Sequence, residues 1–265
     1  MTGPFTIGLL HPGEMGTAVG RSLAAGGHQV LWASEGRSEQ TAGRARAAGF
    51  IDTGTARALT ERAAVIISVC PPHAAVDVAC SVAGFRGLFV DANAVSPQTA
   101  CRVAEIVTKD GARYVDGGII GPPSPLPGST RLYLSGAAAD EVRALFGGTA
   151  VDARIAGAGP WSASALKMAY AGWTKGSAAL LLAMRELANA ESVRDALDAE
   201  WELSLPGVDA QLRLAELSAG RKGWRWTAEM NEIAATMGAA GLPEGFHAAA
   251  AEIFSRFPRG TPAQN

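Results

Sequence analysis

The chain has few aromatic residues, few cysteines and no cluster of basic residues. Aromatic residues make up 6% of its 265 residues, and a net charge of −2 provides no basic surface for nucleic acid. Its three cysteines, Cys70, Cys80 and Cys101, lack metal-ligand spacing, so we expect neither a metal site nor a disulfide scaffold. The sequence contains no run of 18 apolar residues and no apolar leader segment. These absences exclude nucleic-acid and membrane partners and predict a cytoplasmic protein.

Hydrophobic residues make up 48% of the chain, which is enough for a sizeable core. Short apolar runs alternate with helical stretches in the first part of the chain. The expected strands are Phe5–Leu10, Gln29–Ala33, Ala64–Ser68, Leu88–Asp91, Arg113–Val115, Leu132–Leu134 and Val151–Ile155. The expected helices are Glu14–Ala25, Ser38–Ala48, His73–Val82 and Ser96–Thr108. This alternation predicts a Rossmann-type α/β domain, with a mostly parallel sheet covered on both faces.

The remainder of the chain has a helical pattern. Residues 161–191 lack a Gly/Pro cluster and predict one helix of about 45 Å. Three further helices are expected, Val208–Ser218, Arg225–Met237 and Glu244–Phe257, with breaks at Pro206, at Gly220 and at residues 241–243. Residues 258–265 are expected to fray. We therefore predict a dinucleotide-binding domain at 1–158, joined through the long helix to a small all-helical domain at 159–265.

A glycine-containing turn follows the first expected strand. In dinucleotide-binding folds such a turn lets the backbone approach a pyrophosphate, and the next helix presents its N-terminal amides to the anion. Gly13 and Gly16 take the second and third glycine places of the motif, while His11 stands at the first. The candidate cofactor-binding residues of this turn are His11, Pro12, Gly13, Glu14 and Met15.

Two more strand ends carry candidate cofactor residues. Ser34, Arg37 and Ser38 follow the second strand and suit the 2′-phosphate of NADPH, although Glu35 could instead accept from a ribose hydroxyl and Ser38 could simply cap the next helix. The apolar run 65–69 is typical of a central strand ending at a functional crevice, which adds Val69, Cys70 and Pro71.

Four segments together resemble the β-hydroxyacid dehydrogenase and 6-phosphogluconate dehydrogenase superfamily. Residues 11–16 resemble its cofactor signature, and residues 91–97, which include Asn93, resemble its segment near the nicotinamide. Residues 116–122 resemble its substrate-binding strand, and residues 164–171 resemble its catalytic-lysine stretch. They occur in family order, and the helical tail resembles the short C-terminal domain of a 6-phosphogluconate-dehydrogenase-like branch.

The resemblance implies an NAD(P)-dependent oxidoreductase that moves a hydride between nicotinamide and a small hydroxy acid or carbonyl compound. Lys167 would be its general acid–base, because partial burial and an oxidised nicotinamide both lower the proton affinity of a lysine. Ile120, Gly121 and Pro122 stand where the family has a Ser before Gly-Gly, and Ala171 replaces its Asn, so the substrate is not held in the usual gluconate pose. Tyr170, Thr174 and Lys175 are further substrate-binding candidates.

Two other functions fit the same fold. An imine reductase is one, although such relatives usually lack the lysine, and a dinucleotide-binding protein without turnover is the other. NADPH is the expected cofactor in preference to NADH. The helical domain is too small to bury Trp201, Trp224 and Trp226 alone, so we expect a homodimer. A small-molecule substrate is the other expected partner.

Overall fold

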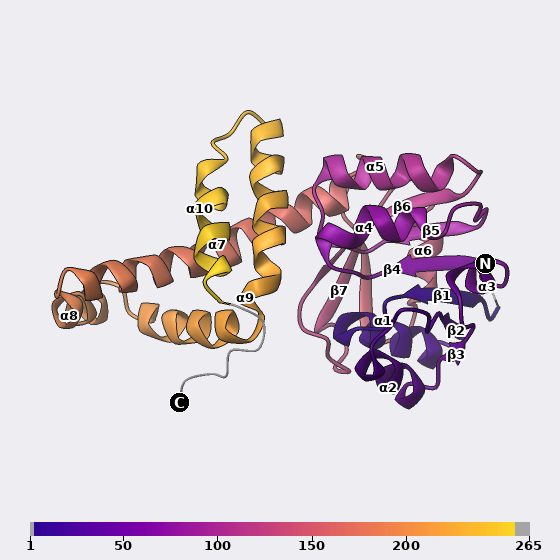
Figure 1. The fold of residues 1–265 in the computed structure, drawn as a ribbon, viewed down its shortest axis with the longest axis horizontal. Helices are drawn as coiled ribbons and strands as arrows, with labels where there is room; N and C mark the ends of the chain where they lie inside the picture. The colour runs from indigo at the N-terminus through magenta and orange to yellow at the C-terminus, as the bar shows by residue number, and fades with distance from the viewer. Residues whose placement is uncertain (1–2, 258–265) are drawn as a thin grey trace. The chain divides into compact units, whose positions relative to one another are not determined.

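The computed structural model describes residues 3–257. By its internal contacts the chain forms two compact units, which divide between Lys167 and Met168. The division falls inside a long helix, after the boundary expected from the sequence at 158/159. The first unit is an α/β domain and the second is helical (Figure 1).

The first unit is built on one eight-stranded sheet in the order β3-β2-β1-β4-β5-β6-β7-β8. Its strands are β1 (Thr6–Leu10), β2 (Gln29–Trp32), β3 (Ile51–Asp52), β4 (Val65–Ser68), β5 (Leu88–Asp91), β6 (Arg113–Ile120), β7 (Thr130–Ser135) and β8 (Val151–Ile155). Every neighbouring pair is parallel except β6 with β7. The mostly parallel Rossmann-type sheet is therefore confirmed. The strand order reverses at β1, where such sheets bind ligands at their carboxyl edge.

Helices cover both faces of this sheet (Figure 1). They are α1 (Glu14–Ala25), α2 (Glu39–Ala47), α3 (Ala56–Thr60), α4 (Ala75–Cys80), α5 (Pro97–Thr108) and α6 (Ala139–Leu145), with a 3₁₀ turn at Pro72–Ala74. One buried apolar cluster joins α1, α2 and α6 to the sheet through side chains such as Leu23 and Val142. The other joins α3, α4 and α5 through Leu59, Val78 and Val103. These two cores fix the strand ends that carry the candidate site.

Several boundaries differ from those expected. The strand expected at Arg113–Val115 continues to Ile120, because buried Gly117 and Gly118 let it pass close to neighbouring backbone. The helix expected at His73–Val82 is a 3₁₀ turn at Pro72–Ala74 followed by α4, which ends at Cys80. The sequence analysis missed β3, α3 and α6, which are too short to show a hydrophobic period.

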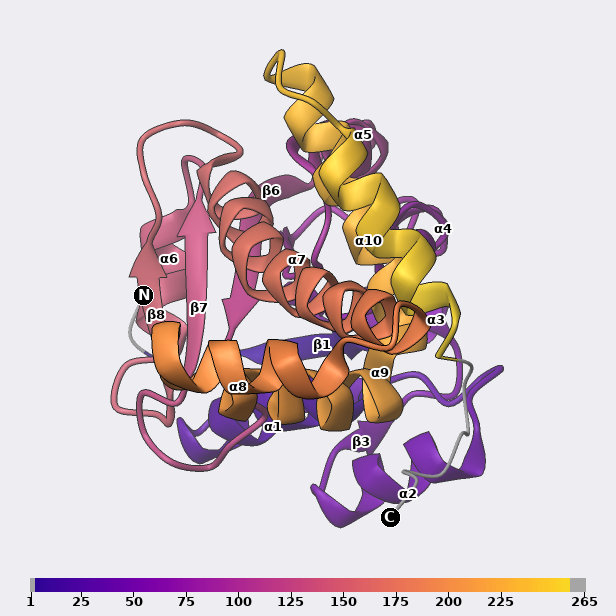
Figure 2. The ribbon, with the colours of Figure 1, turned by 90° about the vertical axis from the view of Figure 1, so that its left-hand side faces the viewer.

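The second unit contains most of α7 (Ser162–Ala190), together with α8 (Arg194–Ser204), α9 (Val208–Ala239) and α10 (Gly245–Ser255). The long helix is confirmed, α8 was not expected, and α10 runs beside α9 (Figure 2). The expected break at Gly220 is wrong, because one glycine costs a helix only about 1 kcal/mol and α9 continues through it. The fraying expected at residues 258–265 lies outside the described residues. None of the described helices is long and apolar enough to cross a membrane.

Candidate functional site

The candidate site of the first unit lies along the carboxyl edge of the parallel strands. β5 ends at Asp91, which pairs with Asp116 of β6, and β6 then continues through Gly117 to Ile120 beyond that end. Parallel β1, β2 and β4 end at the same edge. The motifs identified from the sequence after β1, β2, β4 and β5 are therefore brought together along it.

The turn after β1 has the geometry of an anion-binding turn. A Cβ on Gly16 would lie 2.3 Å from the carbonyl oxygen of His11, so this position requires glycine. Around Gly13, by contrast, no atom of the described chain lies within 4 Å of where a Cβ would stand. Gly13 is the N-cap of α1 and brings no side chain to its first turn, while Thr17 Oγ1 donates to the Pro12 carbonyl at 3.1 Å. Free space and a helix N-terminus together fit the diphosphate of a dinucleotide.

His11 adopts the left-handed conformation that the first glycine of this motif usually supplies. Its φ is 68°, which is uncommon for a residue with a Cβ. Burial, assisted by the positive charge of Arg37, lowers the pKa of the imidazole to about 4. Its Nδ1 is buried and has no hydrogen-bond partner within residues 3–257. A neutral, largely buried imidazole on a left-handed backbone fits a residue that shapes this turn.

The loop after β2 contains the residues expected to select between NADPH and NADH. The Arg37 amide donates to the Ser34 carbonyl at 3.0 Å, which closes a turn, and the Arg37 charge is close enough to act on His11. Ser38 Oγ accepts from the Thr41 amide at 3.3 Å, so Ser38 caps α2 as the alternative interpretation allowed. Glu35 is exposed and its amide donates to the Gly54 carbonyl at 2.8 Å. Arg37 is therefore the charged group of this loop that lies near the phosphate turn.

Asn93 links the ends of β4 and β5. Its Nδ2 donates to Ser68 Oγ at 3.1 Å, and its Oδ1 accepts from the Cys70 amide at 2.5 Å. The Asn93 amide in turn donates to Asp91 Oδ1 at 3.1 Å. The side-chain amide thus contacts the end of β4 through its nitrogen and holds the following Val69–Pro71 loop through its oxygen.

Two buried acids lie beneath this network. Burial raises the pKa of Asp91 to about 7, with Asp116 adding a like charge. Tyr114 Oη lies 3.4 Å from Asp91 Oδ2. Burial, and then Asp91, raise the pKa of the Cys70 thiol to about 12, so this cysteine stays protonated. Cys70 is therefore a neutral group at this strand end.

Residues 120–122 form a tight turn after β6. Ile120 is buried, and Gly121 has a φ of 109°, with a hypothetical Cβ only 2.1 Å from the Ser129 carbonyl oxygen. The Pro122 carbonyl accepts from Thr130 Oγ1 at 2.6 Å. This turn offers backbone and apolar surface where the family has a serine hydroxyl.

Lys167 lies in the first turns of α7, which pack directly on β6. A Cβ on Gly118 would lie 2.9 Å from the Ala163 carbonyl oxygen and 3.0 Å from Lys167 Cβ. The stem of Lys167 therefore stands against the part of β6 that extends past β5. Lys167 is half-buried.

Three polar residues that the sequence analysis did not single out hold the start of α7. Asp116 Oδ2 accepts from the Ser164 amide and from Ser135 Oγ, both at 2.9 Å, and its Oδ1 accepts from Ser164 Oγ. Ser135 Oγ also accepts from the Ala163 amide at 3.0 Å. Asp116 and Ser164 are 48 residues apart, so no local sequence pattern could have indicated this contact.

The other three substrate-binding candidates lie in the second unit. Tyr170 is 46% exposed, and Thr174 Oγ1 donates to the Tyr170 carbonyl at 3.0 Å. The Lys175 ammonium is paired with Glu229 of α9 and stands 5.4 Å from the Trp226 ring centroid. The Lys175 ammonium is thus held by partners within the helical unit, rather than solvated.

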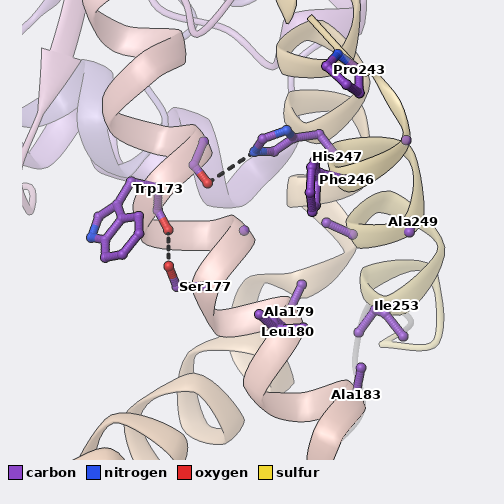
Figure 3. Close-up of a pocket in the computed structure, with 14 residues that line it drawn as sticks. Trp173, Ser177, Ala179, Leu180, Ala183, Pro243, Phe246, His247, Ala249 and Ile253 are labelled. Atoms are coloured by element: carbon purple, nitrogen blue, oxygen red, sulfur yellow. Dashed lines mark hydrogen bonds between the residues drawn. The ribbon is translucent and has the colours of Figure 1, made fainter.

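An apolar groove of about 550 Å³ runs between α7 and α10 (Figure 3). Trp173, Leu180, Phe246 and Ile253 contribute large side chains to it, and Gly172 and Gly176 allow the His247 ring to approach α7. His247 Nε2 lies 3.1 Å from the Gly172 carbonyl oxygen, which ties α10 to α7. This contact gives His247 a structural role.

Comparison with protein families identifies the class. Residues 6–145 match the NAD binding domain of 6-phosphogluconate dehydrogenase, and residues 188–257 match a family described as a domain of unknown function (DUF1932). The first match covers more than half of the chain. The protein therefore belongs to the family of the NAD binding domain of 6-phosphogluconate dehydrogenase, as the sequence motifs indicated.

Individual relatives agree with this assignment. An uncharacterized 28.5 kDa protein of Methanothermus fervidus is 31% identical over 172 residues, which are 64% of this chain and 65% of that protein. The chain thus spans just under two thirds of this relative. Among solved structures, the conserved protein MTH1747, of unknown function but reported as similar to 3-hydroxyacid dehydrogenases, is 26% identical with a TM-score of 0.69 over 95% of this chain and 96% of that one.

Two enzymes share the fold at lower identity. A 3-hydroxyisobutyrate dehydrogenase of Mycobacterium tuberculosis is 17% identical, with a TM-score of 0.73 over 99% of this chain and 97% of that one. A reductive aminase of Aspergillus terreus, solved with NADPH4, is 19% identical, with a TM-score of 0.60 over 98% of this chain and 96% of that one. At these identities the likeness concerns the hydroxyacid dehydrogenase fold alone.

Proposed function

We propose that this protein is an NAD(P)-dependent oxidoreductase that acts on a small hydroxy acid or carbonyl compound, with Lys167 as general acid–base. The observation that carries the proposal is the packing of Lys167 on Gly118, at the carboxyl edge where the phosphate-binding turn also lies. Ile120, Gly121 and Pro122 at the same edge would face the substrate. Tyr170, Thr174 and Lys175 remain further candidates from the second unit.

The residues present divide the chemical work. The amides at the start of α1 and the open side of Gly13 would hold the diphosphate, and His11 and the loop fixed by Asn93 would shape the pocket around it. The cofactor supplies the hydride acceptor or donor when bound. Lys167 Nζ would take the hydroxyl proton of the substrate during oxidation and return it during reduction.

NADPH is the proposed cofactor, in preference to NADH. Support comes from Arg37, whose guanidinium can pair with a 2′-phosphate through two hydrogen bonds, and from the Ser34 backbone turn that orients it. Glu35 lies exposed in the same loop, and its carboxylate would favour NADH if it accepted from a ribose hydroxyl.

Replacing Lys167 by Met tests the proposed function. The rate on hydroxy acids or aldehydes should fall by about 10²–10⁴-fold, while NADPH affinity and the folded state persist. The pH profile of the native protein should show a titrating group that the variant lacks. Lys109→Met, an exposed lysine after α5, is the matched control and should leave the rate unchanged. Retention of more than about a tenth of the activity in the Lys167 variant would remove Lys167 from the mechanism.

Two alternatives predict different outcomes of the same assay. An imine reductase, suggested by the fold shared with the reductive aminase, would reduce imines and turn over no hydroxy acid. A dinucleotide-binding protein without turnover would bind NADPH and convert none of these substrates. Tyr170 would become the leading proton donor if Lys167 proved dispensable.

We also propose that the protein is a homodimer formed through the helical unit. Several large apolar side chains of this unit are exposed, among them Trp173 at 76%, Leu203 at 80% and Phe246 at 75%. Trp173 and Phe246 border the groove between α7 and α10 (Figure 3). Light scattering should give twice the chain mass at micromolar concentration, and Trp173→Glu should give the monomer mass. A native monomer at that concentration would contradict the proposal.

A further inference from the structure

The first turn of α7 is capped by a carboxylate from a distant strand. A helix leaves its first backbone amides without partners inside the helix, and a nearby Asp or Ser side chain usually satisfies them from the N-cap position. Here Asp116 of β6 accepts from the Ser164 amide and hydroxyl, and Ser135 of β7 accepts from the Ala163 amide. The negative charge of Asp116 also stands at the positive end of the helix dipole.

The contacts around this cap leave the helix start little freedom. Ser135 Oγ also donates to Asp116, so the two capping groups are tied to each other across the β6–β7 pair. Trp161, just before α7, packs edge-on against Tyr114 of β6, with ring centroids 5.8 Å apart. Gly118 of β6 packs against the same turn, in contact with Ala163 and Lys167. Asp116 and Ser164 are fully buried, so water does not compete for these hydrogen bonds.

We propose that Asp116 is a positioning residue, whose hydrogen bonds to the first turn of α7 fix the direction in which Lys167 leaves the surface of β6. Lys167 is one helical turn beyond Ala163 and Ser164, so a shift or fraying of that turn displaces its side chain directly. The inference rests on the proposed role of Lys167 for its catalytic consequence, but the positioning itself does not depend on that role. A displacement of a catalytic group by about 1 Å can lower the rate about 100-fold, so a contact that fixes the position of Lys167 affects the rate.

The test follows Lys167 directly, by NMR of protein whose lysines carry ¹³C-methyl groups. The sequence contains only four lysines, Lys109, Lys167, Lys175 and Lys222, and the spectrum of Lys167→Met assigns the signal of interest. Asp116→Asn removes the charge and one of the two acceptor oxygens, so the Ser164 amide and hydroxyl can no longer both donate to this side chain. Ser164→Ala removes one hydrogen bond and keeps the carboxylate. Asp152→Asn, on β8 of the same sheet and paired only with Arg154 in the described structure, is the matched control.

The expected result is a moved Lys167 signal in Asp116→Asn and Ser164→Ala, with the Lys109 and Lys222 signals unchanged and the Asp152 control identical to the native protein. The kcat should fall at least tenfold in Asp116→Asn, while the KM for the cofactor stays within twofold, because the cofactor turn is on β1. A lower melting temperature with an unmoved Lys167 signal in both variants would overturn the proposal. A moved signal with unchanged kcat would support the positioning and contradict the proposed catalytic role of Lys167.

The NMR signal and the kcat together separate this inference from the proposed function. If no substrate is turned over by the native protein, the NMR signal still decides whether Asp116 positions Lys167. If Asp116→Asn does not fold, Ser164→Ala and Ser135→Ala, which each remove one hydrogen bond, carry the test. An unmoved Lys167 signal in both of these would then overturn it.

Discussion

Gly118 and Lys167 lie in direct contact between β6 and α7. A side chain on Gly118 would place its first carbon 3.0 Å from Lys167 Cβ and 2.9 Å from the Ala163 carbonyl oxygen. Real Cβ atoms essentially never show contacts shorter than 3.0 Å, so the distance to the oxygen is too short and the distance to Lys167 Cβ is at that limit. The absence of a side chain at position 118 is therefore what lets the helix bring Lys167 against the sheet edge.

Gly118→Ala should lower activity by pushing the start of α7 away from β6. The added methyl group meets a backbone carbonyl that cannot move without moving the helix, so we expect kcat to fall about 10–100-fold and stability to fall by about 1–3 kcal/mol. Gly43→Ala, inside α2 with free space around it, is the matched control and should be neutral or stabilising by up to about 1 kcal/mol. Steady-state kinetics measures kcat, and urea unfolding measures stability, in the two variants. Equal activity in the two variants would show that α7 tolerates a displacement at this contact.

Arg37→Ala should weaken NADPH binding and leave NADH binding nearly unchanged. Loss of a charged hydrogen bond to the 2′-phosphate corresponds to about 1–3 kcal/mol, which fluorescence titration with each cofactor resolves. Arg102→Ala, an exposed arginine on α5, is the control and should bind both cofactors as the native protein does. Equal losses of affinity for NADPH and NADH in Arg37→Ala would show that Arg37 does not bind the 2′-phosphate.

His11→Gly should become more stable relative to the native protein as the pH falls. The unfolded imidazole takes up a proton near pH 6.5, whereas the folded one does so near pH 4. Between these values the unfolded state binds the extra proton, so the native protein loses stability that the variant does not lose. The difference in unfolding free energy should grow by about 1–3 kcal/mol from pH 7 to pH 4.

Urea unfolding at pH 7, 5.5 and 4 measures this difference. The buried Asp91 has the opposite pH dependence, because its folded pKa is raised to about 7, but it is present in both proteins and cancels. Glycine also relieves the left-handed backbone at this position, which adds a term independent of pH. A difference that stays constant over the whole range would mean that the imidazole titrates normally in the folded protein.

Lys175→Met should destabilise the helical unit rather than only raise the KM for an anionic substrate. The side chains of Lys175 and Glu229 are 19% and 8% exposed, so the variant breaks a largely buried ion pair, at a cost of about 3–5 kcal/mol. The double variant Lys175→Met with Glu229→Gln should recover part of that loss. Arg213→Met breaks an exposed pair with Asp209 on the same α9 and should cost less than about 1 kcal/mol. Unfolding followed by tryptophan fluorescence distinguishes them, and similar losses in the two single variants would contradict the argument.

The sequence by itself determined the parts of this protein that local patterns encode. Alternating apolar runs and helices identified the parallel sheet, and the exact bounds of α1, β5 and β8 followed from clear caps and apolar segments. The glycine turn lies within the matched family domain at residues 6–145, and it could be found because it is a short motif of neighbouring residues.

Features that join distant segments were decided only by the tertiary structure. The sequence assigned Asp116 only to a segment resembling the substrate-binding strand, and its capping role appears once β6 lengthens past β5 and meets Ser164, 48 residues away. Lys175 looks like an available cation on a helix until α9 brings Glu229 against it. The uninterrupted α9 likewise overrides Gly220, since tertiary packing outweighs about 1 kcal/mol of local preference. Hydrogen bonds and ion pairs depend on position in space, and the sequence states only the order of the residues along the chain.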